Sequence, residues 1–402
     1  MIFRPDAIDR EVDALSQSAL LHASPFRLID PARAAGAAHL QAIEFPLWFV
    51  TILLQIAVLA WFWRSGSSAR LRDALRGRIG SAFGLRFAFG AALALVDNLS
   101  ALIPQFFQYR MTRIMGLSDA LTRFWLLGWL ESAIVTMIVA GLIAAIVLWL
   151  ADRTHQWYLY TIAGIVGFTL LIAYVDPYVV APAYRRYEAA AISPSLRSFF
   201  AYASAKVENP RVTIVEQATM HRTREGFAYV IGWGGSQQIV VSDTLFAGAT
   251  EPELKFVFAR SLAWIAANDA LHQTLIEAAF IVLGTALAIF IADRTPFRRD
   301  DDPLSRLALV GALLGCVYLL AAPFYNGYLR QREAAADQNG VALTGDRASA
   351  IRLVVRSADQ SLTPICPSLF AHWYFDSHIA PGRRITQLQG VPDACSSKQP
   401  GP

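Results

Sequence analysis

Six long apolar segments constrain this chain more than any other feature of its sequence. A helix needs about 20 mostly apolar residues to cross the hydrocarbon core of a bilayer. Inside lipid the backbone must satisfy its own hydrogen bonds, so single segments cross as helices. The chain is therefore predicted to be an α-helical polytopic membrane protein. The six segments are residues 46–64, 83–107, 127–150, 157–180, 273–292 and 305–325.

Composition agrees with lipid-facing helices and excludes a nucleic-acid-binding protein. Hydrophobic residues make up 55% of the 402 residues and charged residues 16%, whereas a soluble domain is about one quarter charged. The net charge of +4 is small, and no basic run is interleaved with aromatic residues. We expect membrane lipids and no nucleic acid as partners. The alanine- and arginine-rich composition favours a bacterial inner (cytoplasmic) membrane.

The apolar segments divide the chain into five regions, two of which read as extramembrane. Short Val-, Ile- and aromatic-rich runs at 211–216, 227–232 and 238–242 are typical of strands, and a polar helix is expected at 194–208. Two intervening spans bring both extramembrane regions to one side of the membrane, so we expect a split α+β domain. The regions are a leader (1–44), transmembrane helices 1–4 (45–180), the first domain part (181–272), helices 5 and 6 (273–325), and the second part with the tail (326–402).

Two features bear on which side of the membrane the domain occupies. The connector at residues 65–82 is rich in arginine, and the positive-inside rule places such a connector in the cytoplasm. Cys366 and Cys395 flank one C-terminal segment and could pair in an oxidising compartment, although two unpaired thiols are the plainer interpretation of the sequence. The sequence leaves the sidedness open.

Short motifs follow one another in a fixed order through the extramembrane regions. The strand FAYVIG at 227–232 is followed by a second strand ending IVVSDTL at 239–245. A helix start EPEL at 251–254 comes next, and EAAAD at 333–337 and SHIAP at 377–381 follow later. In this order the motifs resemble the integral-membrane CAAX prenyl protease family of zinc metallopeptidases. The resemblance implies a metalloprotease-like domain with a cytosolic active-site face.

The zinc-binding motif of that family is degenerate in this chain. The family helix carries His-Glu-x-x-His, in which both histidines bind Zn²⁺ and the glutamate is the general base. Here the resemblance places Arg260 at the first histidine, Ser261 at the glutamate and Trp264 at the second histidine. Arginine offers no lone pair, an indole N–H only donates, and serine cannot replace a carboxylate base. We therefore expect no catalytic set, no metal site and no zinc cofactor.

Two acidic residues and one histidine stand at positions that belong to the family site. Glu333 stands at the third zinc ligand, Asp337 one turn later, and His378 at a histidine that supports the transition state. A solvated acidic pair and a structural hydrogen-bonding histidine are the plainer readings. Because a carboxylate in a partly dry pocket needs a partner, we expect Arg260 to pair with Glu333, shared with Asp337. Trp264 would fill the vacated volume.

A peptide-binding strand survives the loss of the metal in this interpretation. In an active relative the strand at 227–231 would bind an extended substrate by edge-strand addition, which uses main-chain hydrogen bonds and needs no metal. The substrate-binding residues carried over from the resemblance are Phe227, Ala228, Tyr229, Val230 and Gly232.

The sequence thus predicts a pseudoprotease, a membrane scaffold that binds a peptide or a membrane-protein partner. One alternative is an active hydrolase with a non-standard site, such as Ser261 with His378 or a carboxylate. Another is a carrier or channel with polar residues along a path through the spans. Asp97 and Glu277 lie in or near spans, where an ionisable group is a functional candidate. Burial in a water-containing chamber of the family type would also explain both.

Overall fold

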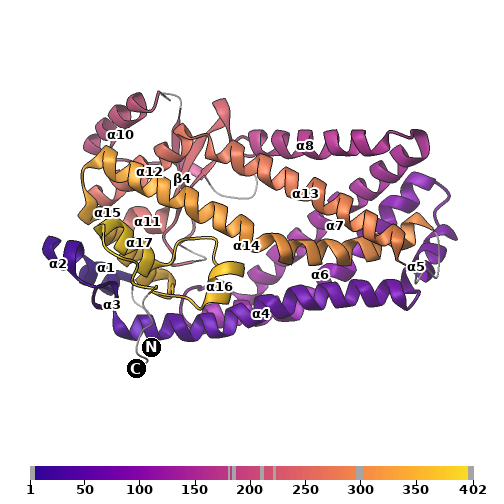
Figure 1. The fold of residues 1–402 in the computed structure, drawn as a ribbon, viewed down its shortest axis with the longest axis horizontal. Helices are drawn as coiled ribbons and strands as arrows, with labels where there is room; N and C mark the ends of the chain where they lie inside the picture. The colour runs from indigo at the N-terminus through magenta and orange to yellow at the C-terminus, as the bar shows by residue number, and fades with distance from the viewer. Residues whose placement is uncertain are drawn as a thin grey trace.

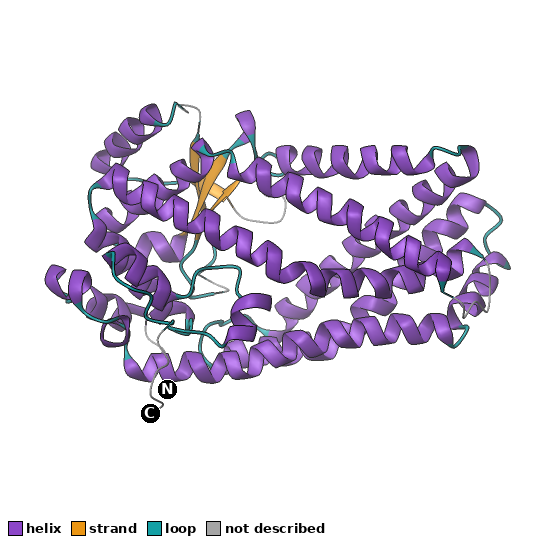
Figure 2. Ribbon diagram, in the orientation of Figure 1, coloured by secondary structure: helices purple, strands orange, loops and turns teal. Residues whose placement is uncertain are grey.

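The computed structural model describes residues 5–179, 182, 187–208, 212–220, 223–295 and 302–396. Six of the described helices are long and apolar enough to cross a membrane, which confirms the predicted polytopic architecture. They form an elongated bundle, and the strands gather with most of the shorter helices at one end of it (Figures 1 and 2). Ala181, where the first domain part was predicted to begin, and residues 397–402 lie outside the described residues. The spans are α4 (Pro31–Arg64), α6 (Ala82–Ile114), α7 (Thr122–Arg153), α8 (Trp157–Val175), α13 (Asp269–Arg294) and α14 (Pro303–Thr344).

Small residues let α6 and α7 pack closely inside the bundle. A Cβ atom added at Gly90 would lie 2.7 Å from the Cβ atom of Ala144, and one at Gly141 would lie 2.8 Å from the carbonyl oxygen of Phe87. In lipid, apolar surface alone gives little reason for helices to associate, so close backbone approach through small residues is a main source of packing energy. At the end of the bundle far from the strands, α5 (Ser67–Arg76) connects α4 to α6.

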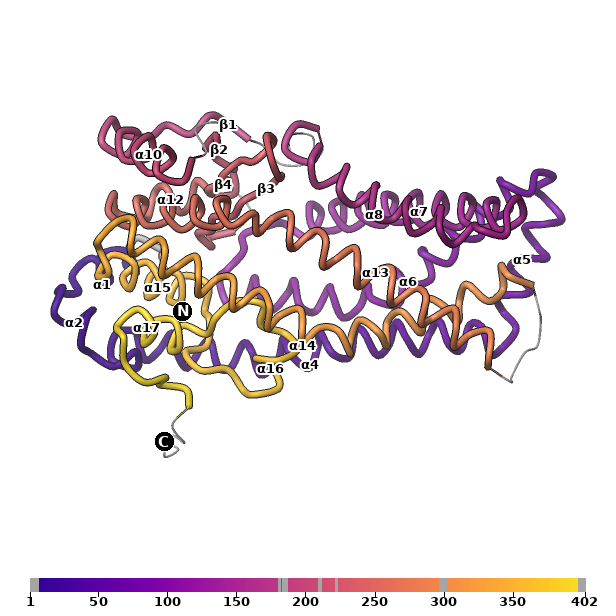
Figure 3. The backbone as a smooth tube through the Cα atoms, turned by 45° about the horizontal axis from the view of Figure 1, so that its top comes forward, coloured from indigo at the N-terminus to yellow at the C-terminus, as the bar shows by residue number. Residues whose placement is uncertain are grey.

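Four short strands form a mixed sheet in the order β1–β2–β4–β3. β2 (Thr213–Gln217) pairs in parallel with β4 (Gln238–Ser242). β1 (Tyr187–Ala189) and β3 (Ala228–Ile231) pair antiparallel on the two outer sides. β2, β3 and β4 match the three predicted strand runs, whereas the three-residue β1 was not predicted. As Figure 3 also shows, β3 is an outer strand of the described sheet, so one of its edges has no strand partner there.

The extramembrane helices enclose one hydrophobic core with the sheet. Phe256, Phe258 and Ile351 are completely or almost completely buried in this core, together with Ile239 of β4. These residues come from both extramembrane regions, which lie at the same end of the bundle (Figure 1). The helices are α10 (Pro194–Lys206), α11 (Asp243–Gly248), α12 (Glu251–Ala266), α15 (Arg347–Ser361), α16 (Leu369–Tyr374) and α17 (Pro381–Gln389), with a 3-10 turn at Gly234–Ser236.

α12 and α14, the helices that carry Arg260 and Glu333, connect to the membrane spans in different ways. The side chains of Thr250 and Glu253 cap the start of α12 reciprocally, which satisfies backbone N–H groups that have no partner inside the helix. α12 ends at Ala266, because Asn268 adopts a left-handed conformation with φ of 53° before α13 begins. α14 instead continues unbroken from the membrane into the domain. Its membrane-spanning part therefore fixes the position of Glu333.

Part of the leader folds onto the domain as three short helices, α1 (Pro5–Asp13), α2 (Gln17–His22) and α3 (Pro25–Leu28), whereas residues 31–44 form the first part of α4. Ile8, Val12 and Leu20 belong to the main core cluster. The fully buried guanidinium of Arg356 in α15 joins α1 to α12, because it lies 2.6 Å from Asp9 Oδ1 and 3.1 Å from Glu253 Oε2. The leader is therefore part of the folded domain.

Candidate functional site

The candidate site lies where α12 and α14 approach each other. A Cβ atom at Gly340 of α14 would come within 3.1 Å of both the Cβ and the backbone nitrogen of Arg260 in α12. Any larger residue at this position would push the two helices apart. The glycine therefore lets the Arg260 side chain reach the acidic face of α14 one to two turns earlier, where Glu333 and Asp337 are buried.

Two arginines and two carboxylates form a compact ion cluster at this crossing. Arg260 Nη2 lies 3.1 Å from Glu333 Oε1, and Arg260 Nε lies 2.9 Å from Asp337 Oδ1. Arg384 in α17 donates two hydrogen bonds to Asp337, at 2.6 Å and 2.9 Å. Its Nη1 atom also lies 3.3 Å from Glu333 Oε1. The pair expected between Arg260 and Glu333, shared with Asp337, is thus present in the structure.

Arg384 is the member of this cluster that sequence reasoning did not place there. Burial by itself lowers the pKa of Arg384, but the neighbouring carboxylates of Asp337 and Glu333 outweigh it and raise the pKa above its ordinary value. The guanidinium therefore remains charged, and the charges of two arginines balance those of two carboxylates. A signal was available, because Arg384 lies only three residues after the SHIAP motif at 377–381.

His378 and the backbone after it contact the second oxygen of Glu333. The amide of Ile379 donates a hydrogen bond of 2.8 Å to Glu333 Oε2, and His378 Nδ1 lies 3.5 Å from the same oxygen. The His378 side chain itself is largely exposed, at 84%. Glu333 is therefore held from three elements, and His378 is open to solvent on its other side.

Ser261 and Trp264 lie on α12 beside Arg260 and contribute no acid–base partner. Ser261 is buried and Trp264 is half-buried. The hydrogen bonds of the described residues include none between Ser261 and His378 and none from the Trp264 indole nitrogen. An activated serine needs a base within about 3 Å. The described geometry therefore offers no support for the serine hydrolase alternative.

The residues at the site do not fit the zinc ion that the resemblance implies. No group of three or more His, Cys, Asp or Glu side chains in the described part of the chain is arranged to hold a metal ion. Guanidinium and indole groups stand at two ligand positions and have no lone pair to offer. Both oxygens of Glu333, the one retained ligand, are already occupied by cations or by hydrogen-bond donors.

The predicted peptide-binding strand is β3, preceded by Phe227 and followed by Gly232. Phe227 is fixed to the end of β4, because its amide donates to Ser242 Oγ at 3.0 Å and its carbonyl accepts from the Ser242 amide at 3.0 Å. The Tyr229 hydroxyl donates to Gln217 Oε1 at 2.7 Å. Gly232 has a φ of 77°, a left-handed conformation that suits glycine where the chain turns away from the strand. All four residues of β3 are partly exposed.

Asp243 of the SDTL motif has a structural role. Its carboxylate accepts hydrogen bonds from the amides of Thr219, Met220 and Thr244 and from the Thr219 hydroxyl. Burial raises the pKa of Asp243, but these donors outweigh it and leave the pKa below its ordinary value. The aspartate thus ties the segment after β2 to the start of α11.

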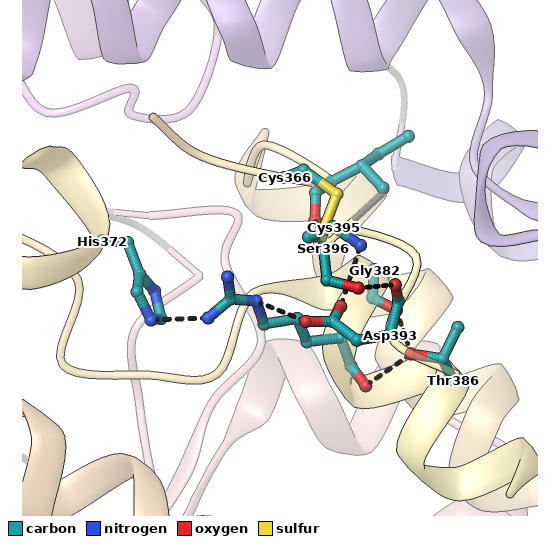
Figure 4. Close-up of a disulfide and its surroundings, with 9 residues drawn as sticks. Cys366, His372, Gly382, Thr386, Asp393, Cys395 and Ser396 are labelled. Carbon is teal, nitrogen blue, oxygen red and sulfur yellow. Dashed lines mark hydrogen bonds and ion pairs between the residues drawn. A yellow bond between two sulfur atoms is a disulfide. The ribbon is translucent and has the colours of Figure 1, made fainter. Parts of the chain in front are cut away.

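Cys366 and Cys395 form a disulfide (Figure 4), which decides a question that the sequence left open. The bond joins the loop after α15 to the segment after α17. Nearby, Arg383 lies 3.1 Å from Asp393 and 2.8 Å from the Nε2 atom of His372. Burial, together with Arg330 and Arg383, lowers the pKa of His372 to about 4. At neutral pH the imidazole is therefore uncharged and accepts a hydrogen bond from Arg383.

Comparisons with known proteins agree with the fold and the motif order. Residues 193–391 match peptidase family M48, and residues 37–186 match the N-terminal region of CAAX prenyl proteases with five membrane helices. The chain is 22% identical over 379 residues to the uncharacterized metalloprotease YhfN of Bacillus subtilis (strain 168), covering 91% of this chain and 88% of that protein.

A solved structure shares the fold over almost the whole chain. The crystal structure of Ste24p of S. mikatae superimposes with a TM-score of 0.76 and 14% sequence identity, covering 96% of each chain. The carrier or channel alternative assumed that the resemblance to the family is superficial. The two family matches contradict that assumption. On the two family matches and this fold, the chain belongs to the CAAX prenyl protease (M48) family of membrane metallopeptidases.

Proposed function

We propose that this chain is a catalytically inactive member of its family, a pseudoprotease that acts as a membrane-embedded binding scaffold. The observation that carries the proposal is the ion cluster of Arg260, Glu333, Asp337 and Arg384 at the crossing of α12 and α14. A guanidinium held between two carboxylates repels a divalent cation and fills the place where one would bind. The cluster converts a catalytic centre into a cross-link between helices.

The ligand that we propose is an extended peptide segment or a partner membrane protein that presents one. The outer edge of β3 has no strand partner in the described sheet. Such an edge offers N–H and C=O groups to an added strand, and alternating side-chain pockets provide selectivity. Because this recognition uses the backbone, it does not depend on a metal. Without hydrolysis, a bound segment would be held and released intact.

We also propose that the domain lies outside the cytoplasm, at the outer face of a bacterial inner membrane. A disulfide is stable in an oxidising compartment and rare in the cytosol. The connector between α4 and α6, at the opposite end of the bundle, carries Arg70, Arg72, Arg76 and Arg78, and such connectors face the cytoplasm. The bacterial origin is supported by the B. subtilis relative.

Metal content and peptide hydrolysis test the inactive state directly. The full-length protein, purified without chelator and then equilibrated with excess zinc, should retain far less than one zinc per chain after dialysis. It should cleave neither prenylated nor unprenylated peptides above the rate of the Arg260→Ala variant. Stoichiometric zinc together with cleavage above that rate would contradict the proposal.

Labelling of single cysteines in intact bacterial cells tests the orientation. In a Cys316→Ser background, Gln338→Cys places an exposed thiol on the domain part of α14, and Arg78→Cys places one on the opposite connector. A membrane-impermeant maleimide should label Gln338→Cys in intact cells and Arg78→Cys only after lysis. The reverse pattern would put the domain in the cytoplasm.

A further inference from the structure

A cavity of about 1360 Å³ lies among the membrane spans. Residues from α4, α6, α7, α8, α13 and α14 line it. Pockets for drug-sized ligands enclose about 300–1,000 Å³, so this cavity is large enough for a long aliphatic molecule. Its wall is mainly aliphatic and aromatic, which suits a hydrocarbon chain and makes a small polar substrate a poor fit.

Asp97 is the only charged residue among the described residues that line this cavity. It lies near the midpoint of α6, and Gln55 of α4 donates a hydrogen bond of 3.0 Å to its Oδ2 atom. The ion pairs between described residues include none that involves Asp97. The carboxylate therefore faces an apolar chamber with an amide partner and without a cation from the described part of the chain.

An ionised carboxylate that faces an apolar cavity is stabilised by a positively charged partner. Taking an ionised carboxylate out of water costs several kcal/mol or more unless a counter-charge or several donors compensate. One neutral amide compensates only part of this cost. A cationic group brought in by a ligand would complete the partnership, whereas an anionic group would be repelled by the same carboxylate in a medium that screens charge weakly.

We propose that the cavity binds a long-chain amphiphile whose protonated amine pairs with Asp97 and whose hydrocarbon chain packs on the apolar wall. Gln55 donates the one side-chain hydrogen bond that Asp97 receives from the described residues, and the ligand amine would supply the positive charge that this neutral amide lacks. The proposal is independent of whether the domain hydrolyses peptides, since no residue of the α12–α14 ion cluster lines the cavity. It assigns a binding site within the membrane to a side chain that has no role in the extramembrane site.

Photo-crosslinking of the full-length protein in lipid nanodiscs tests this selectivity. Three probes share one diazirine-bearing alkyl chain and differ in the head group: an amine, an alcohol or a carboxylate. At pH 7 the amine probe should label peptides of the cavity-lining helices at least about tenfold more than the carboxylate probe, the equivalent of about 1.4 kcal/mol. The alcohol probe should fall between them.

The variants Asp97→Asn and Glu131→Gln form a matched pair. Each removes one carboxylate from the bundle, but Glu131 is exposed on α7 and does not line the cavity. Asp97→Asn should abolish the preference for the amine, and Glu131→Gln should retain it. Equal labelling by amine and alcohol, a preference that survives in Asp97→Asn, or no labelling of the cavity-lining helices would each overturn the proposal.

A third variant keeps the test decisive if Asp97→Asn does not fold. Gln55→Met removes the amide partner and leaves the Asp97 carboxylate as the only polar group of that pair. The preference for the amine probe should then persist or increase, because the ligand becomes the sole partner of the carboxylate. Loss of the preference in a folded Gln55→Met protein would overturn the proposal that the Asp97 carboxylate itself selects the amine.

Discussion

Arg260 Nη2 lies 3.1 Å from Glu333 Oε1, and the contact joins α12 to α14 at the positions where the family places a histidine and a glutamate on the same metal. In the proposed pseudoprotease, the ion pair takes the place of a metal-mediated link between the two helices. Arg384 approaches the same Glu333 oxygen to 3.3 Å. Glu333 therefore has two cationic partners, and the stability of the site does not depend on Arg260 alone.

This second cation sets the expected effect of removing Arg260. Breaking a buried ion pair usually costs about 3–5 kcal/mol when the remaining charge is left alone. After Arg260→Ala, Arg384 still contacts both carboxylates, so we expect a loss of about 1–3 kcal/mol in unfolding free energy. Thermal unfolding in detergent should show a clear decrease for Arg260→Ala and a larger one for Arg384→Ala. Arg347→Ala, at an exposed position in α15, is the control. An unchanged melting temperature for Arg260→Ala would show that the pair contributes nothing.

Asp359 predicts a pH dependence of stability. It is buried in α15, its Oδ1 atom has no hydrogen-bond partner among the described residues, and Arg33 Nη1 lies 3.8 Å from Oδ2. Burial raises its pKa to about 7, although Arg33 and a backbone hydrogen bond from Asp30 oppose the shift, while the carboxylates of Asp30 and Glu11 add to it. The folded state then holds a proton that the unfolded state has lost. The contribution of Asp359 to stability is therefore present below about pH 4 and is lost as the pH rises to about 7.

Asp359→Asn should remove this dependence. The variant is expected to gain stability relative to the native chain at pH 8, where the buried carboxylate is charged. Its advantage should shrink at pH 5, where the carboxyl group is already protonated in the folded state. Melting temperatures of both proteins at the two pH values measure the difference. Glu188→Gln removes an exposed carboxylate of β1, outside the spans, and should show no such trend. If Asp359→Asn and the native chain lose stability in parallel, another group is responsible.

The disulfide predicts a substantial loss of stability on its removal. Cys366 and Cys395 are 29 residues apart in sequence, and closing a loop of this length stabilises the folded state by about 3–4 kcal/mol in the chain-entropy model. The double variant Cys366→Ala/Cys395→Ala should therefore melt at a clearly lower temperature, and dithiothreitol should destabilise the native chain similarly. Cys316→Ala is the control, because Cys316 is an unpaired, exposed cysteine in α14. Insensitivity of the native chain to both treatments would argue against the bond.

The features that sequence could predict are those with a local signal. Apolar length identified the spans, and β-like runs identified three of the four described strands. The Arg260–Glu333 pair followed from placing two motifs on two helices that the family packs together. In each case the evidence lay within a few residues of the feature, or the resemblance to the family indicated which distant segments lie together.

Contacts between residues far apart in the sequence, and the exact ends of helices, could not be predicted from local signals. Nothing near Arg356 indicates that its partner Asp9 lies 347 residues away, so the leader was assigned no place in the fold. The end of α12 depends on the left-handed backbone of Asn268; asparagine suits this conformation, but one asparagine is not enough to locate a helix end in the sequence. β1 has only three residues, and it exists because β2 offers it an edge.

Restoring the family motif gives the last prediction. The triple variant Arg260→His, Ser261→Glu and Trp264→His places two histidines four residues apart on one face of α12, the spacing that holds Zn²⁺ on a helix. Removing Arg260 also frees Oε1 of Glu333 from one cation, while the Ile379 amide still orients Oε2. We expect the variant to bind zinc through the two introduced histidines and Glu333. Binding should be recovered more readily than catalysis, since catalysis also requires an ordered substrate and a metal-bound water.

Zinc per chain after dialysis, together with thermal unfolding with and without a chelator, measures the outcome. The triple variant should retain close to one zinc and lose stability when chelated. Arg260→His alone supplies only two ligands with Glu333 and should retain none, because a catalytic zinc site uses three protein ligands. If the triple variant is folded but takes up no zinc, the distance between α12 and α14 has itself changed from that of a metal site. Restoring the side chains would then not be enough to restore a metal site. The ion cluster would have a purely structural role at the crossing of α12 and α14.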